Sequence, residues 1–156
     1  MSNKEPLKIA YLLGSLDRGG AETLMLDVFR KAKDAGLEII GVHRKGGLLA
    51  DDFLSTGVPM FRLRPRSIFD LFYLFRLRKI LQEHDIQLVH AQQAIDAFLV
   101  WLACLGTSIK IALTLHGFDH ALEGWAASVT GFIIRRTDLN IFVSDIQKEF
   151  YRRKYR

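Results

Sequence analysis

Short apolar runs, many of them rich in β-branched residues, recur along the chain and alternate with longer segments whose apolar positions follow a helical period. The apolar runs have the length of strands and cover residues 7–13, 37–42, 58–63, 86–90, 109–115 and 139–143. The helical pattern predicts helices over residues 21–35, 48–55, 68–83, 94–105, part of 122–136, and from 145 onward.

This alternation predicts a single α/β domain over residues 1–156, with a mostly parallel sheet and helices on both of its faces. Residues 109–115 are apolar throughout, as is typical of a strand that is covered on both sides. The expected fold class is therefore a Rossmann-like, doubly wound sheet. In the first helix, Leu24, Val28 and Ala32 share one face, and Gly36 stands just beyond the helix, where glycine is favoured.

Ligands of such sheets bind beyond the carboxyl ends of the strands, which directs attention to the loops at those ends. The first strand leads into Gly14, and the glycine pair Gly19-Gly20 then precedes Ala21-Glu22 at the start of a helix. Glycines allow close backbone approach, and a helix N-terminus offers free N–H groups and a positive dipole end. We therefore expect an anion site at Gly19 and Gly20, unless these glycines only form a tight turn.

Two familiar phosphate-binding motifs do not fit this loop. A P-loop requires Lys and Ser or Thr where this chain has Gly20 and Ala21. The dinucleotide pattern G-x-G-x-x-G is absent, and the second strand ends at His43-Arg44 rather than at an acidic residue. We expect neither a P-loop nucleotidase nor an NAD-dependent enzyme.

Two histidines, His90 and His116, stand at the ends of predicted strands. A histidine in that place can donate to a substrate oxygen or carry a proton near neutral pH, although a hydrogen-bonded core histidine would give the same pattern. Gly117 follows His116 and leaves space beside it. His43, His84 and His120 have the pattern of ordinary surface or loop residues.

The composition of the chain limits which binding partners and which cellular compartment we expect. The chain has 49% hydrophobic and 25% charged residues with a net charge of +5, which suits a folded domain with anionic partners. Its single cysteine, Cys104, has no zinc-ligand neighbours, so we expect no metal and a reducing, cytoplasmic location. The longest uncharged stretch, residues 97–109, is shorter than the roughly 20 residues of a membrane span.

A basic, aromatic segment covers residues 62–79, where arginines and one lysine alternate with phenylalanines and a tyrosine. Such a segment suits the inner face of an anionic membrane. The competing interpretation is that Leu71, Leu74, Phe75, Leu77 and Leu81 pack on the sheet while the arginines remain solvated. We expect no nucleic-acid partner, since no nucleic-acid-binding motif accompanies the segment.

Several short motifs follow one another in a particular order. They are Lys8-Ile9-Ala10-Tyr11 up to Gly14, Gly19-Gly20-Ala21-Glu22, Leu88-Val89-His90, Thr114-Leu115-His116-Gly117 and Ile141-Phe142-Val143-Ser144. In this order, on a Rossmann-like pattern, the set resembles the N-terminal, acceptor-side domain of GT-B fold glycosyltransferases, in particular the family-four group of retaining enzymes.

The resemblance implies sugar transfer from a nucleotide sugar to a carbohydrate or lipid-linked acceptor, such as a cell-envelope polysaccharide, without a cofactor or metal. Gly19 and Gly20 would bind the donor phosphates, and His116 would act at the reaction centre. His90, Gln92 and Asp119 are candidates for acceptor binding, with Asp119 close enough in sequence to orient the His116 ring. Gln92 stands where many relatives have a second histidine.

Relatives also carry a C-terminal nucleotide-sugar-binding domain, which is absent from these residues. Ser144 would cap the last helix rather than act in catalysis. Two other functions fit the fold, namely a sugar-nucleotide or phosphosugar epimerase and a non-catalytic, flavodoxin-like binding module.

Overall fold

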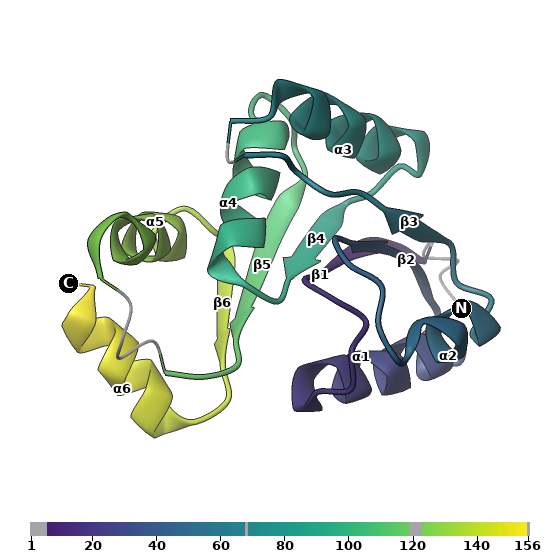
Figure 1. Ribbon diagram of the computed structural model, residues 1–156, viewed down its shortest axis with the longest axis horizontal. Helices are drawn as coiled ribbons and strands as arrows, with labels where there is room; N and C mark the ends of the chain where they lie inside the picture. The colour runs from purple at the N-terminus through teal and green to yellow at the C-terminus, as the bar shows by residue number, and fades with distance from the viewer. Residues whose placement is uncertain (1–5, 68, 119–122, 156) are drawn as a thin grey trace, which may run out of the picture.

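The computed structural model describes residues 6–67, 69–118 and 123–155. Within these residues, six strands form one sheet in the order β3-β2-β1-β4-β5-β6, and every neighbouring pair is parallel (Figure 1). The strands are β1 (Leu7–Leu13), β2 (Leu37–His43), β3 (Met60–Arg62), β4 (Leu88–Ala91), β5 (Lys110–Leu115) and β6 (Leu139–Phe142). The predicted Rossmann-like, doubly wound sheet is confirmed.

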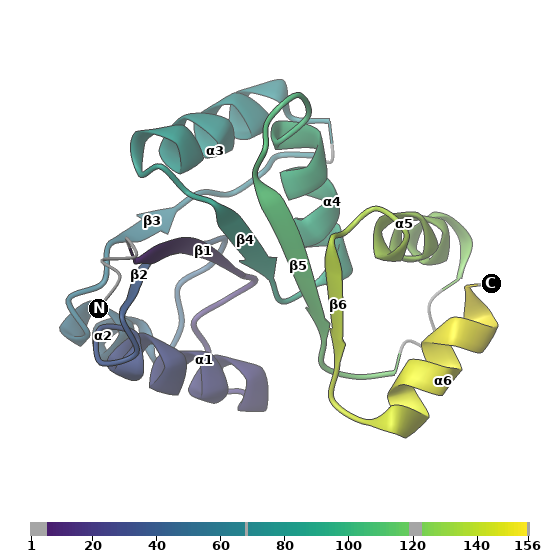
Figure 2. The ribbon, with the colours of Figure 1, turned by 180° about the vertical axis from the view of Figure 1, so that it is seen from behind.

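Helices cover both faces of this sheet (Figures 1 and 2). They are α1 (Gly20–Lys31), α2 (Ala50–Ser55), α3 (Leu71–Glu83), α4 (Ala94–Ala103), α5 (Gly124–Ile134) and α6 (Asp145–Lys154). One apolar core joins the sheet to α1 and α2, and the other joins it to α3, α4 and α5. No helix among the described residues is long and apolar enough to cross a bilayer.

Alternate side chains of the central strand β1 enter the two cores. Ala10 and Leu12 belong to the core under α3 and α4, whereas Ile9, Tyr11 and Leu13 belong to the core under α1 and α2. A strand whose two faces are both buried must be apolar at nearly every position. This requirement explains the continuous apolar run from which the strand was predicted.

The first helix differs from its prediction. It ends at Lys31 rather than at residue 35, and Gly36 has the expected positive φ of 68°. Its buried face is formed by Met25, Leu26 and Phe29, while Leu24 is 53% exposed. The predicted face was wrong at Leu24, because consecutive helical positions are about 100° apart and Met25 already faces the sheet.

Two helix starts are fixed by side-chain caps. The Asp70 carboxylate accepts a hydrogen bond from the Tyr73 backbone N–H at 3.0 Å, so α3 begins at Leu71 instead of residue 68. The Ser144 hydroxyl accepts one from the Gln147 N–H at 3.2 Å, which confirms Ser144 as the cap of α6. The other predicted ranges differ from the observed ones by a few residues.

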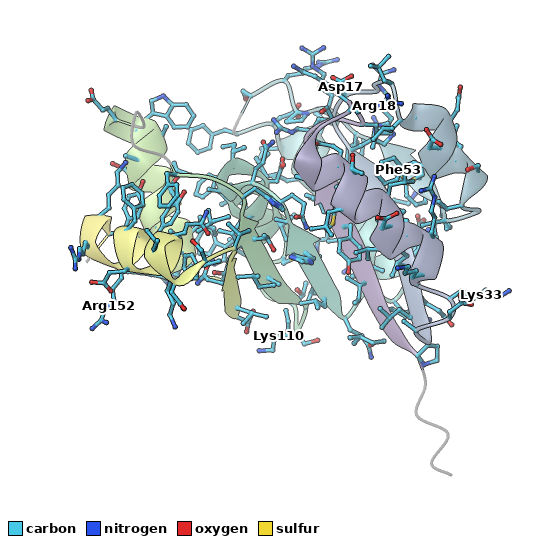
Figure 3. The ribbon with its side chains drawn as sticks, turned by 90° about the horizontal axis from the view of Figure 1, so that it is seen from below. Asp17, Arg18, Lys33, Phe53, Lys110 and Arg152 are labelled. Carbon is cyan, nitrogen blue, oxygen red and sulfur yellow. The ribbon has the colours of Figure 1, made fainter. Side chains whose placement is uncertain are left out.

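The sheet has two functionally distinct edges. Asp17 and Arg18, in the loop after β1, lie at the carboxyl edge, and Lys33 and Lys110 lie at the amino edge (Figure 3). The strand order reverses between β1 and β4, and doubly wound sheets bind their ligands at the carboxyl side of such a reversal.

His43, at the end of β2, was predicted to be an ordinary surface or loop residue, and this prediction is wrong. It is only 9% exposed, and its Nδ1 lies 2.9 Å from the carbonyl oxygen of Lys45. The residue is buried because β2 extends one residue further than predicted and pairs His43 with Leu13.

Candidate functional site

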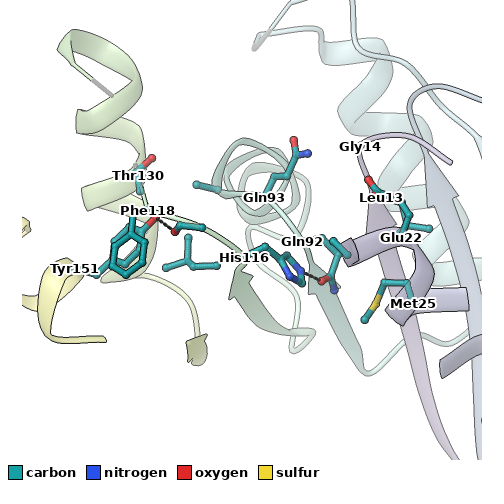
Figure 4. A pocket seen from close by; sticks show the side chains of 14 residues that line it. Leu13, Gly14, Glu22, Met25, Gln92, Gln93, His116, Phe118, Thr130 and Tyr151 are labelled. Carbon is teal, nitrogen blue, oxygen red and sulfur yellow. Dashed lines mark hydrogen bonds between the residues drawn. The ribbon is translucent and has the colours of Figure 1, made fainter. Parts of the chain in front are cut away.

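A cavity of about 320 Å³ opens at the carboxyl edge, where the strand order reverses (Figure 4). The loops after β1, β4 and β5 supply Gly14, Gln92 and His116, and the first turn of α1 supplies Glu22. Thr130 of α5 and Tyr151 of α6 form the opposite wall. The predicted site residues Gln92 and His116 are thus brought together from two strand ends.

His116 and Gln92 point toward each other across the cavity floor (Figure 4). The His116 Nε2 lies 2.6 Å from the Gln92 Oε1. An amide oxygen can only accept, so Nε2 carries the proton and Nδ1 of the neutral ring remains an acceptor. Burial lowers the pKa of His116, and the Glu22 carboxylate acts in the opposite direction. The net lowering favours the neutral ring at pH 7.

The nitrogen of the Gln92 amide, Nε2, also bears on ligand binding in the cavity. The residue is 7% exposed, and its Nε2 has no hydrogen-bond partner among the described residues. A buried donor without a partner costs free energy, which a ligand oxygen would recover. Gln92, which lines the cavity, therefore holds an unpaired donor that is buried beside the His116 ring.

The predicted anion site lies at the start of α1. Gly19 is the N-cap residue, with an extended backbone at φ −123° and ψ 171°, and no side chain caps the helix. An added Cβ on Gly20 would meet no atom within 4 Å, so the first turn is open to its surroundings. Ala21 and Glu22 line the cavity, but Gly19 and Gly20 themselves stand just outside its wall.

Glu22 occupies the space beside this helix start. A Cβ on Gly19 would collide with the Glu22 Oε2, so the carboxylate lies against the glycine. A negative group is favoured at a helix N-terminus. The Glu22 carboxylate is thus an internal anion at the position where a ligand phosphate was predicted to bind.

His90 takes a different position from His116. Its Nε2 lies 2.7 Å from the Thr114 hydroxyl, and its ring is 5.2 Å from that of Tyr11. Burial, with a smaller contribution from His116, lowers the pKa of His90 to about 4. His90 does not line the cavity, so the structure joins it to the sheet packing rather than to His116 and Gln92.

An ion pair fixes the strand ends next to the cavity. Arg44, after β2, places its Nε 3.0 Å from the Asp96 Oδ1 and donates from Nη2 to the Gln93 Oε1 at 2.6 Å. Burial raises the pKa of Asp96, and Arg44 opposes that shift. Gly14 packs against this group, because an added Cβ would lie only 2.6 Å from the Gln93 Nε2. Close approach therefore explains glycine at position 14.

The backbone next to His116 is fastened to α6. The Gly117 carbonyl oxygen accepts from the Gln147 Nε2 at 2.8 Å and from the Tyr151 hydroxyl at 3.0 Å. Gln147 is fully buried, and its Oε1 accepts from the Val143 N–H at 2.8 Å. One side chain thus links the turn before α6 to the turn that carries His116.

The remaining candidates for chemistry are Asp119, a metal site and the Cys104 thiol. Asp119, the proposed partner of His116, lies outside the described residues. In the part of the chain that the structure describes, no three His, Cys, Asp or Glu side chains are grouped to hold a metal ion. Burial raises the pKa of the Cys104 thiol to about 11, which keeps it protonated and unreactive at pH 7.

The sequence profile of Glycosyltransferase Family 4 matches residues 18–156, which include α1 and the ends of β4 and β5 that line the cavity. The chain belongs to Glycosyltransferase Family 4. Among curated protein sequences, none matches the chain significantly.

Solved glycosyltransferase structures have the same fold as this Family 4 domain. The Rickettsia africae glycosyltransferase has a TM-score of 0.74 at 18% identity, covering 94% of this chain and 39% of that one. Anabaena HepE, crystallised with UDP-glucose, has a TM-score of 0.79 at 16% identity over 95% and 40%. Sucrose-phosphate synthase of Thermosynechococcus elongatus has 0.72 at 13% over 94% and 45%. The domain spans about two fifths of these relatives' length.

Three residues of this cavity and its support were not predicted from the sequence to act there. Glu22 was noted only as part of the glycine motif, and Gln147 and Tyr151 were not considered at all. Both of the latter reach Gly117 from positions at least 30 residues away in the chain. Such contacts leave no local pattern, although a glutamine three residues after the cap Ser144 is a capping-box signal that could have singled out Gln147.

Proposed function

We propose that this domain is the acceptor-side half of a glycosyltransferase that moves a sugar from a nucleotide sugar to an acceptor with retention of configuration. The observation that carries the proposal is the meeting of the α1 N-terminus, His116 and Gln92 around one cavity at the strand-order reversal. Membership of Family 4 supports sugar transfer, and HepE, crystallised with UDP and with UDP-glucose, supports a nucleoside diphosphate donor.

In this proposal the donor diphosphate binds at Gly19 and Gly20. The free N–H groups and dipole of α1 stabilise its negative charge as the bond to the sugar breaks. The incoming phosphate displaces the Glu22 carboxylate from Gly19, since two anions cannot share one helix start. The freed carboxylate stays at the cavity wall, where it can accept a hydrogen bond from a sugar or acceptor hydroxyl.

His116 and Gln92 then act on the sugar. The neutral His116 accepts at Nδ1, and the unused Gln92 Nε2 donates, so a hydroxyl of the transferred sugar can satisfy both. Interactions of this kind accelerate transfer only where they become stronger in the transition state. The acceptor, a carbohydrate or a lipid-linked carbohydrate, approaches from the side of the Gln92 and Gln93 loop.

The other wall of the cleft is assigned to a second Rossmann-like domain. The relatives support this proposal, because the domain covers only about two fifths of their length. A domain that forms only one side of the cleft should bind the nucleotide weakly and should not catalyse sugar transfer. No cofactor or metal is invoked, because helix N–H groups take the role of the cation.

The test is an NMR titration of the isotope-labelled 156-residue chain with UDP and with GDP, followed by a sugar-transfer assay. We expect weak binding with the largest amide shifts at Gly19, Gly20 and His116, tighter binding for Glu22→Gln, and no turnover. The amide of Gly46, in the neighbouring loop, is the internal control. Shifts confined to other surfaces would contradict the donor site, and turnover by the chain alone would contradict the two-domain cleft.

A further inference from the structure

Large apolar side chains are exposed at the start of α3. Phe69, Leu71, Phe72 and Phe75, which we call the α3 patch, are 70%, 75%, 83% and 68% exposed. The inward face of the same helix is buried through Tyr73, Leu77 and Leu81. The interpretation that Leu71 and Phe75 pack on the sheet is therefore wrong, since each lies about half a turn or more from the buried positions.

Exposed cations flank this patch along the chain. Arg62, Arg64 and Arg66 are exposed on the segment that leads into α3, and Arg76 and Lys79 are exposed on the helix. Arg78 is directed elsewhere, because it donates to the carbonyl oxygens of Ala103 and Leu105. The described part of residues 62–79 thus has five exposed cations.

The single acidic residue between residues 62 and 79, Asp70, already accepts hydrogen bonds within the chain. Asp70 accepts from the backbone N–H groups of Arg66 and Tyr73, and these hydrogen bonds lower its pKa. Its charge is therefore compensated at the helix start. Lys79 is also 3.6 Å from Glu83, an exposed pair that weakly competes with an external anion. The patch and its surroundings remain strongly positive.

We propose that the α3 patch docks on an anionic lipid bilayer. Three phenylalanines and a leucine on one short surface, flanked by arginines, match the apolar interior and the negative headgroups of such a bilayer. A neutral protein surface would satisfy the apolar side chains but offer no anionic partner to the exposed arginines. Figure 1 shows α3 on the outside of the molecule, on the face of the sheet opposite α1 and α2.

The patch also lies near the carboxyl edge. Tyr73, in the first turn of α3, feels the charges of Asp96 and Arg44, which hold the strand ends beside the cavity. Docking through the first turns of α3 would therefore bring the cavity close to the headgroup region. The inference itself rests on α3 and its arginines and does not require the proposed transfer reaction.

The experiment is co-sedimentation of the 156-residue chain with vesicles of phosphatidylcholine, with and without phosphatidylglycerol, at low and high salt. We expect binding only to the anionic vesicles, weakened by salt. Replacing Phe69, Phe72 and Phe75 with serine should reduce the partition coefficient at least about tenfold. Replacing Arg64, Arg66 and Arg76 with glutamine should remove the preference for anionic lipid.

A matched variant controls for net charge, with Lys31 of α1, Lys33 of the turn after α1 and Arg152 of α6 changed to glutamine. It should bind like the unmodified chain. Equal binding to neutral vesicles, or an equal loss in this control, would overturn the proposal. So would dimerisation that the serine variant abolishes, or binding to single-stranded RNA in place of vesicles. Circular dichroism of each variant confirms that it is folded.

Discussion

The proton on His116 is placed by Gln92. Because the amide oxygen of Gln92 accepts from Nε2 at 2.6 Å, the neutral ring keeps Nδ1 as an acceptor. Burial lowers the histidine pKa and keeps the ring neutral, while Glu22 limits the shift. A charged imidazole would lose Nδ1 as an acceptor. The balance between burial and Glu22 therefore decides which hydrogen bonds the site can make.

Within the proposed phosphate site, Gly20 is the residue whose substitution should disturb the fold least. An added side chain meets nothing within 4 Å, and the φ of Gly20 is not in the left-handed region, so Gly20→Val should fold. Its side chain would stand where the diphosphate is expected, and the affinity for UDP should fall about tenfold or more. Gly46→Val, at an equally open glycine in the next loop, is the matched control. Equal UDP affinity in both variants, measured by calorimetry, would refute the phosphate site.

His90 should make the domain less stable in mild acid. Its pKa is about 4 in the folded chain and 6.5 in the unfolded chain, so between these values only the unfolded chain binds the proton. The free energy of unfolding should therefore decrease as the pH falls from 6.5 to 4, by on the order of 2 kcal/mol.

The variant His90→Gln should lose this pH dependence, and His84→Gln, at the end of α3, should keep it. Urea titrations at a series of pH values measure the effect. Asp96, whose pKa is raised, contributes a slope of opposite sign that is common to all three proteins. Parallel curves for the native chain and His90→Gln would show that His90 is not responsible.

At the scale of elements, local patterns predicted which segments become strands and helices but not how each helix is rotated. The apolar runs located the six strands of the described residues, and in the inner strands β1 and β5 double-sided burial explains the continuous apolar sequence. The buried faces of the helices were predicted less well than the strands. Leu24 and Phe75 are apolar yet exposed, while Met25 and Tyr73 take the buried positions. Contact with the sheet decides the rotation, and a sequence with apolar residues on both sides of a helix leaves it open.

The α6 helix holds the turn after β5 through Gln147. Gln147→Leu would keep the side-chain volume roughly constant but leave the Val143 N–H without its acceptor and the Gly117 carbonyl with one donor fewer. We expect a loss of about 1–3 kcal/mol in the free energy of unfolding. Gln82→Leu, on the exposed side of α3, should cost little by comparison. Urea unfolding compares the two, and equal midpoints would contradict this role of α6.

On the scale of the whole molecule, topology brings the candidate site together. The sequence placed His116, Gln92 and the glycine pair at strand ends, and the crevice rule then predicted one shared edge. The structure confirms the shared edge and joins His116 to Gln92, whereas His90 points into the packing beside Tyr11. Distances of a few ångströms between side chains from different strands depend on register and could not be obtained from spacing.

If sugar transfer takes place at this cavity, as proposed, His116→Ala should slow it. The enzyme required is this domain joined to a second Rossmann-like domain, assayed with a nucleotide sugar and acceptor. Loss of one polar or acid–base contribution should lower kcat by about 100-fold, with little change in melting temperature. A normal kcat would contradict the account, and a fall in melting temperature that matches the fall in activity would make His116 a structural residue.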